Sequence, residues 1–285
     1  MFYTRDIKKN NLISEENFGY LSFNGKNIYV SIYKPKNNCK KIIVLLDSLL
    51  NEQNHSLYFC SHLARSLAIR GFMIIRFDYY GTGNSDGDFN MVTFDTLCED
   101  FNSIISWSKK NYSDCIFYTC IGIRYGCHIL FHYPEFLKFF SKFVFVHPII
   151  NMSQYFKSAY IHKHVMSYNL NSEEKLTTKK ILESINFNSS IELRGFLFNS
   201  LFIKQLLSIK ELSTVNFFDL NALFIFDKKY NNSINQENKE NNKIAIECLE
   251  IAQGKSWDKE NFIQEKDLQF RIIKLINNYI AMDYF

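Results

Sequence analysis

The stretch Gly122-Ile123-Arg124-Tyr125-Gly126 constrains this chain more than any other. Its spacing is that of G-x-S-x-G, in which a sharp turn from a strand into a helix displays a serine nucleophile above a sheet. Here the central residue is Arg124, whose guanidinium stays protonated and offers no nucleophilic hydroxyl or thiol. The stretch therefore predicts a strand, a tight turn and a helix that keep the frame of a catalytic elbow without its reactive group.

The chain is long enough to bury a substantial core, since it has 285 residues and 47% of them are hydrophobic. This length favours one domain with an inserted lobe, or at most two domains. The 33 basic and 29 acidic residues give a net charge of only +4, and the basic residues form no long run. A nucleic-acid partner would need a clustered basic face, so the sequence argues against one.

Seven cysteines are scattered along the chain, and none has C-x-x-C or another metal-ligand spacing, so we expect no metal and no other cofactor. Cys120 and Cys127 flank the elbow and are interpreted as packed core residues rather than nucleophiles. Residues 1–9 lack the apolar stretch of a signal peptide, and no run is suited to span a bilayer. The expected location is the cytoplasm. The oligomeric state is left open.

Apolar runs of strand length alternate with amphipathic runs of helix length, which favours a mostly parallel, doubly wound sheet. The sequence predicts an α/β fold with a single domain over residues 1–285, and a small helical lid inserted at residues 151–215. The predicted strands are 41–46, 72–77, 115–121, 143–146, 221–226 and one within 243–251, after a hairpin at 18–33 that turns at Asn24-Gly25; the predicted helices are 57–70, 93–111, 125–133 and 268–280.

Five segments spread over most of the chain share the patterns of one known group of proteins. Residues 52–56 are similar to its E-x-N-x-S loop, and residues 76–89 to its D-x-x-G-x-G-x-S-x-G-D-F loop. Residues 122–126 are similar to its G-L-R-x-G elbow, in which arginine also replaces serine, and His147-Pro148 and, loosely, residues 191–200 match two more segments. The group is the exosortase A system-associated hydrolases of type 2, in the α/β-hydrolase superfamily. The resemblance implies the α/β-hydrolase fold and a bacterial accessory to surface-polysaccharide or exosortase-linked gene sets.

The usual chemistry of that fold needs a nucleophile, an acid and a histidine in that chain order. Asp227 follows a predicted strand at the place expected for the acid. No histidine follows it, so two of the three members are missing and a standard Ser-His-Asp hydrolase is disfavoured. His147 is a candidate for a displaced general base, although a hydrogen-bonded framework histidine is the plainer interpretation.

Arg124 has two interpretations. Its planar guanidinium can bind the carboxylate or phosphate of a ligand through two parallel hydrogen bonds, or it can pair with Glu52 or Asp227 in a structural salt bridge. For the loop expected at residues 47–56, both ligand binding and self-capping are open. The residues predicted to bind a ligand beside Arg124 are Glu52, Asn54, Ser48, Tyr125 and Trp257.

Three functions follow from these observations. In the first, a protein with an incomplete triad binds a small acyl, ester or anionic ligand at Arg124 without turning it over. In the second, an active acyl hydrolase, thioesterase or acyltransferase uses relocated catalytic residues, with His147 as its base. In the third, an aromatic-rich lobe around residues 155–202 binds a protein partner on a retired enzyme scaffold.

Overall fold

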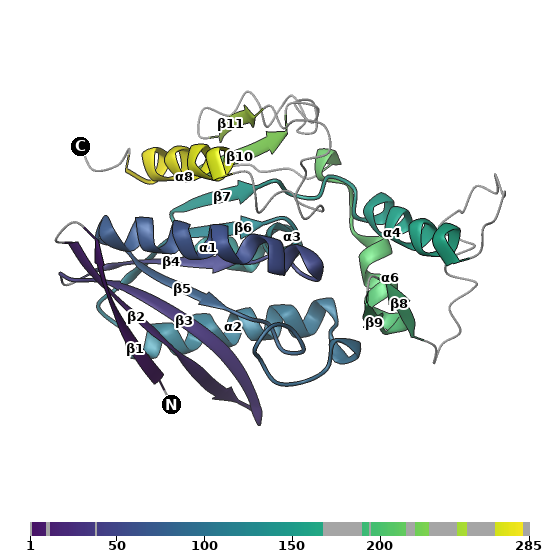
Figure 1. Ribbon diagram of the computed structural model, residues 1–285, viewed down its shortest axis with the longest axis horizontal. Helices are drawn as coiled ribbons and strands as arrows, with labels where there is room; N and C mark the ends of the chain where they lie inside the picture. The colour runs from purple at the N-terminus through teal and green to yellow at the C-terminus, as the bar shows by residue number, and fades with distance from the viewer. Residues whose placement is uncertain are drawn as a thin grey trace.

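A computed structural model describes residues 2–9, 12–37, 39–167, 190–193, 195–214, 220–227, 244–249 and 266–281. Its centre is a sheet with helices on both faces, and a smaller group of elements lies to one side (Figure 1). The predicted α/β class and the mostly parallel, doubly wound sheet are confirmed. The single-domain boundaries stay a prediction.

Nine strands of the described residues form the main sheet, in the order β1-β2-β3-β5-β4-β6-β7-β10-β11. The first three are antiparallel to their neighbours and the last six run parallel to one another. Their bounds are β1 Phe2–Lys9, β2 Leu12–Phe23, β3 Lys26–Pro35, β5 Met73–Phe77, β4 Lys41–Leu46, β6 Ile116–Ile123, β7 Lys142–Val146, β10 Ala222–Asp227 and β11 Ile244–Leu249.

The antiparallel edge is larger than the sequence predicted. The turn at Asn24-Gly25 is confirmed, with both residues at positive φ, but β2 begins at Leu12 rather than at residue 18. The edge strand β1 was not predicted at all. Polar residues such as Thr4, Arg5 and Asp6 interrupt its apolar pattern, so the sequence carries no clear strand signal there.

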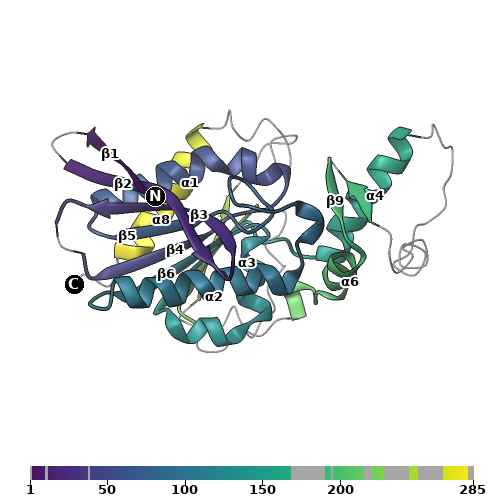
Figure 2. The same ribbon diagram turned by 90° about the horizontal axis from the view of Figure 1, so that it is seen from below.

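Alternate side chains of the parallel strands enter two cores, one on each face of the sheet. Ile43 and Leu45 of β4 pack with α1 Asn51–Ile69 and α8 Lys266–Ala281, whereas Ile42, Val44 and Leu46 pack with α2 Phe94–Asn111 and α3 Gly126–His132. Figure 2 shows α1 and α8 on the side of the sheet opposite to α2. Apolar side chains on both faces explain why these strands read as continuous hydrophobic runs.

Helix α1 begins at Asn51, six residues before the predicted start, so the loop expected at residues 47–56 is much shorter. The chain turns at Leu50, which has a φ of 62° and a ψ of −146°, and enters the helix directly. Glu52 lies in the first turn, where a carboxylate interacts favourably with the helix dipole. Glu52, Asn54 and Ser56 therefore project from a helix, which fixes their directions.

The segment between β7 and β10 forms a small separate layer beside the sheet (Figures 1 and 2). Its described elements are α4 Met152–Ser167, β8 Ile191–Leu193, β9 Phe196–Phe198, α6 Ser200–Ser208 and the 3-10 turn Leu212–Thr214. The hairpin of β8 and β9 is a departure from the all-helical lobe that we expected, and Gly195 turns it with a φ of 82°. The assignment of residues 151–215 as a lid stays a prediction.

Aromatic contacts attach this segment to the loop that follows β5. Phe89, in the 3-10 turn Phe89–Met91, lies 5.1 Å from the ring of Phe196 and 5.0 Å from that of Phe198. The side-chain amide of Asn199 donates to the carbonyl oxygens of Asn90 and Val92 at 2.7 and 2.8 Å. The segment is thus packed against the domain, not merely tethered to it.

Asp100 holds, from within the core, the chain just before the glycine-rich loop at residues 81–88. Its carboxylate accepts the backbone N–H of Tyr80 at 2.8 Å, and its side chain lies on the inner face of α2. Burial raises the pKa of the Asp100 carboxyl from 3.8 to about 6, against the opposing effect of the Tyr80 hydrogen bond. The folded state therefore binds more protons than the unfolded state between these two values, and stability falls as pH rises through that window.

We expect Asp100→Asn to remove this dependence. The amide can still accept the Tyr80 N–H but carries no buried charge at neutral pH. The free energy of unfolding of the variant minus that of the wild type should be about 2 kcal/mol larger at about pH 8 than at about pH 4. Urea unfolding of both proteins across this range measures the difference, and a difference that does not change with pH would contradict the assignment.

Candidate active-site region

The elbow has the backbone geometry of a catalytic turn. Arg124 links β6 to α3 with a φ of 52°, in the left-handed region, and its N–H donates to Val146 O at 2.9 Å. The two glycines of the frame are required by close packing, since a Cβ on Gly126 would lie 2.3 Å from Leu46 O and one on Gly122 would lie 2.9 Å from the Cα of Cys127. The predicted strand, turn and helix are therefore confirmed, with arginine at the apex.

The Arg124 side chain forms a bidentate ion pair with Glu52. Nε donates to Glu52 Oε2 at 2.9 Å and Nη2 donates to Oε1 at 2.8 Å. Nη1 donates to the backbone oxygen of His147 at 3.1 Å. Only 2% of the Glu52 side chain and 15% of the Arg124 side chain are exposed. The sequence offered Glu52 and Asp227 as partners of Arg124, and Glu52 is the carboxylate that forms this ion pair.

Tyr155 of α4 completes the cluster from the inserted segment. Its hydroxyl donates to Glu52 Oε1 at 2.9 Å, and its ring centre lies 5.8 Å from the guanidinium carbon of Arg124. Glu52 thus receives hydrogen bonds from both Arg124 and Tyr155, as a buried carboxylate requires. Tyr155 could not be assigned to the site from sequence, because α4 comes to lie beside the start of α1 only in the folded protein.

Asp227 and His147 lie at the same edge of the sheet as Arg124. Asp227 is the last residue of β10, two strands from β6, and a spacing of about 4.8 Å per strand separates the two backbones by about 10 Å. His147 directly follows β7 between them, is buried, and has a φ of 48°. It is the backbone oxygen of His147 that bonds Arg124, and its N–H donates to Ile225 O at 2.8 Å. A base role for its imidazole stays a prediction.

The other predicted ligand-binding residues have different surroundings. Ser48 is fully buried and bonds the Asp47 carboxylate and the Ser56 hydroxyl, which supports the self-capping interpretation over an open binding role. Asn54 is exposed on α1, and Tyr125 is buried beside the elbow. Trp257 lies outside the described residues.

A buried charge network that the sequence did not predict supports the start of α1. Arg76 of β5 donates to Asp47 Oδ2 through Nε at 3.2 Å and to Asp78 Oδ1 through Nη2 at 3.3 Å. Asp47 also accepts the Ser56 hydroxyl at 2.6 Å, and Asp78 accepts the Asn84 N–H at 2.9 Å. Burial raises the pKa of Asp78 although the charge of Arg76 opposes this. The network fixes the loop after β4 and the loop after β5 against each other.

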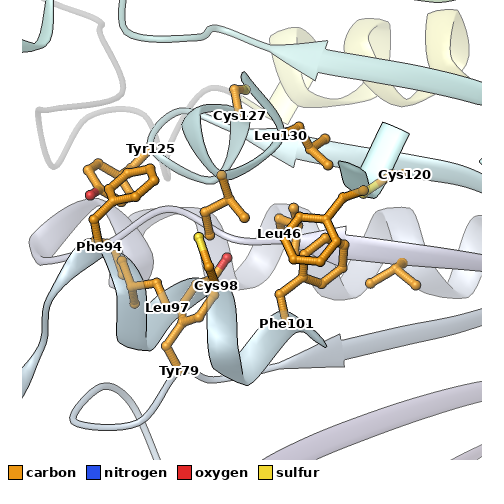
Figure 3. Close-up of a cluster of buried hydrophobic side chains, with 14 of the residues drawn as sticks. Leu46, Tyr79, Phe94, Leu97, Cys98, Phe101, Cys120, Tyr125, Cys127 and Leu130 are labelled. Carbon is orange, nitrogen blue, oxygen red and sulfur yellow. The ribbon is translucent and has the colours of Figure 1, made fainter. Parts of the chain in front are cut away.

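The two cysteines beside the elbow are core residues, as predicted. Cys120 and Cys127 are fully buried, and burial raises the pKa of both thiols above their usual value. Figure 3 shows both among apolar side chains that include Leu46, Phe101 and Leu130. A buried thiol in such surroundings is a poor nucleophile.

An apolar pocket lies over the elbow, between the domain and the inserted segment. Its cavity volume is about 30 Å³, and it is partly open to solvent. The Tyr155 side chain lines this pocket and also bonds Glu52, so the pocket and the ion pair share a wall. The lining residues are Leu49, Leu50, Phe89, Tyr125, Met152, Tyr155, Phe156, Leu193, Phe198, Phe202 and Leu206.

The sheet order, the crossing helices and the elbow at the carboxyl end of β6 define an α/β-hydrolase fold. A sequence profile of the X-Pro dipeptidyl-peptidase (S15) family matches residues 24–126, just over a third of the chain, and ends on the last glycine of the elbow. The fold that the resemblance implied is thereby confirmed. The narrower group associated with exosortases stays a prediction.

Several solved structures are similar to this one over most of its length. Est1E from Butyrivibrio proteoclasticus with bound ferulic acid has a TM-score of 0.59 at 14% identity, and the match covers 92% of this chain and 99% of that one. XC6422 from Xanthomonas campestris, described as an α/β serine hydrolase without a lid, has a TM-score of 0.57 at 10% identity, with 94% of each chain covered.

A mouse protein, α/β-hydrolase domain-containing protein 10, has a TM-score of 0.54 at 16% identity, with 93% of this chain and 98% of that one covered. At such identities the likeness shows the fold alone. No curated protein matches the sequence. No helix of the described residues is long and apolar enough to cross a membrane. Within the same residues, no group of three or more His, Cys, Asp or Glu side chains is placed to hold a metal ion.

Proposed function

We propose that this protein is an α/β-hydrolase-fold binding protein that takes a small, uncharged acyl or ester ligand into the pocket over its elbow and does not hydrolyse it by Ser-His-Asp chemistry. The observation that carries the proposal is the bidentate ion pair between Arg124 and Glu52 at the apex of the elbow. An arginine fixed in this way is neither a nucleophile nor a base. The sequence also has no histidine after Asp227 to activate one.

The charge state of Arg124 favours an uncharged ligand over an anionic one. Three donor groups of the guanidinium are already committed, two to Glu52 and one to the backbone oxygen of His147. An incoming carboxylate or phosphate would have to compete with Glu52, whose charge would then be buried without its main partner. The pocket itself is lined by apolar side chains, which suit a hydrocarbon chain or ring.

Binding of matched probes tests this proposal. We expect methyl octanoate to raise the melting temperature of the protein, and sodium octanoate to do so much less, because a bound ligand stabilises the folded state in proportion to its affinity. Ferulic acid, which is bound in the structure of Est1E, is ionised at neutral pH and should, like octanoate, shift the melting temperature much less than the ester. The absence of any shift with the ester, or a larger shift with the anion, would contradict the proposal.

Two leucines of α6 offer a variant and its control. Leu206 is 3% exposed and lines the pocket, whereas Leu201 on the same helix is 52% exposed. Leu206→Phe should fill the pocket and weaken binding of methyl octanoate by about tenfold, while Leu201→Phe should leave it unchanged. Isothermal titration measures both affinities. Equal affinities for the two variants would show that the ester binds elsewhere.

The other two hypotheses predict different results. A relocated active site predicts ester turnover that is lost in His147→Ala. A protein-binding scaffold predicts no thermal shift with any of the three probes. On the sequence resemblance, we also propose that the protein is an accessory of exosortase-linked systems.

A further inference from the structure

Two cysteines lie side by side at the end of the sheet opposite to the elbow. Cys39 stands two residues before β4, and Cys115 directly precedes β6, its neighbour in the sheet. Lys41 and Ile116 are paired across these strands, and the N–H of Ile116 donates to Lys40 O at 2.8 Å. The two cysteines, which are 76 residues apart in sequence, are therefore fixed at the same level of adjacent strands.

A hydrogen bond brings the two cysteines into direct contact. The Cys115 thiol donates to the backbone oxygen of Cys39 at 3.1 Å, which places its sulfur against the Cys39 main chain. The Cys39 thiol donates to Lys41 O at 3.1 Å and accepts the Lys41 N–H at 3.4 Å. A disulfide spans Cα atoms about 4.4 to 6.8 Å apart, and residues at neighbouring positions of adjacent strands, which are about 4.8 Å apart, are compatible with that range once rotation about the Cα–Cβ bonds brings the sulfurs together.

Their exposure separates these two cysteines from the others. Cys60, Cys98, Cys120 and Cys127 are buried, whereas Cys39 and Cys115 are partly exposed. Cys248 is also partly exposed, but it lies in β11, four strands away from β4. Cys39 and Cys115 are therefore the pair, among the described residues, that combines access to solvent with a neighbouring thiol.

We propose that Cys39 and Cys115 are a modification site that forms an intrachain disulfide by exchange with a small-molecule disulfide such as oxidised glutathione. One protein thiolate attacks a sulfur of that molecule and releases one of its halves as a thiol. The second protein thiolate then attacks the sulfur of the first cysteine in this mixed disulfide, forms the Cys39–Cys115 bond and releases the other half as a thiol. The two cysteines are oxidised, the small disulfide is reduced to two thiols, and the two protein protons are passed to them through solvent.

The bond would join the two central strands of the sheet. The disulfide closes a loop from Cys39 to Cys115, which contains Asp47 and Glu52, whereas Arg124 follows at the other end of β6. Loops of this length gain the most from a crosslink, through the lost freedom of the unfolded chain. Burial raises the pKa of both thiols, so the exchange should speed up as pH increases.

Incubation of the native protein with oxidised glutathione at about pH 8, followed by intact-mass measurement and peptide mapping, tests the proposal. We expect a loss of two hydrogen atoms, a linked peptide pair that contains Cys39 and Cys115, and a melting temperature raised by about 5 °C. The loss should be absent from Cys39→Ser and from Cys115→Ser and should persist in the control Cys248→Ser.

Mapping of the wild-type protein makes the test independent of whether the variants fold. A bond mapped to any other pair would overturn the proposal, and so would mixed disulfides with glutathione that do not resolve, or seven thiols that remain unmodified. None of these outcomes bears on ligand binding at the elbow, which the probes of the pocket test separately.

Discussion

Replacement of Arg76 by methionine is expected to lower the free energy of unfolding by about 3 to 5 kcal/mol. Arg76 is buried between Asp47 and Asp78, and methionine would leave both carboxylates without a cation in the core. The charges of the two aspartates raise the pKa of Arg76 even though its burial acts in the opposite direction. Urea unfolding followed by circular dichroism measures the loss.

Arg70→Met is the matched control for this prediction. Arg70 is exposed at the end of α1, and its side chain bonds the backbone and hydroxyl oxygens of Ser66, a short local contact, so its replacement should cost about 0.5 kcal/mol or less. If the two variants lose the same stability, the buried network does not support the two loops in the way described.

The second large effect is expected for Arg124→Ser, which restores the usual residue of the elbow. The variant should lose about 2 to 4 kcal/mol of stability, because the buried carboxylate of Glu52 would lose the cation that pairs with it. It should also gain no esterase activity, since no histidine follows Asp227 to activate the new serine. Urea unfolding and the hydrolysis of a nitrophenyl ester check the two parts.

A second substitution separates the charge effect from the loss of packing. In the background of Arg124→Ser, Glu52→Gln removes the buried charge and should recover most of the lost stability, whereas the same change in the wild type should be destabilising. A double variant whose losses simply add would contradict a direct coupling between Arg124 and Glu52.

The parallel half of the sheet and its covering helices could be predicted from sequence because each strand is a continuous apolar run. The elbow could also be predicted, because its two glycines are set by contacts with Leu46 and Cys127 that no other residue allows. The start of α1 was wrong because Asn51 to Ser56 is polar and resembles a loop, while the turn that begins the helix depends on the backbone of Leu50. The lobe's hairpin was missed for a different reason, because three-residue strands carry almost no periodicity.

The site was predicted in part. Sequence offered Glu52 and Asp227 as partners of Arg124 and could not choose between them, because both belong to the same edge of the sheet. The choice depends on how α1 presents Glu52, and on Tyr155, which comes from 103 residues farther along the chain. The Arg76 network gave no local signal, since its two aspartates only appear as residues that end apolar strands. Such contacts are properties of the assembled fold.

The central claim is that the elbow carries a charge-paired arginine and no working nucleophile. The most direct test is to incubate the wild-type protein with a fluorophosphonate serine probe and, in parallel, with nitrophenyl esters, beside a heat-denatured control. We predict no labelled serine near the elbow and ester turnover no faster than that of the control. Labelling of a serine in that region, or turnover well above the control, would contradict the claim.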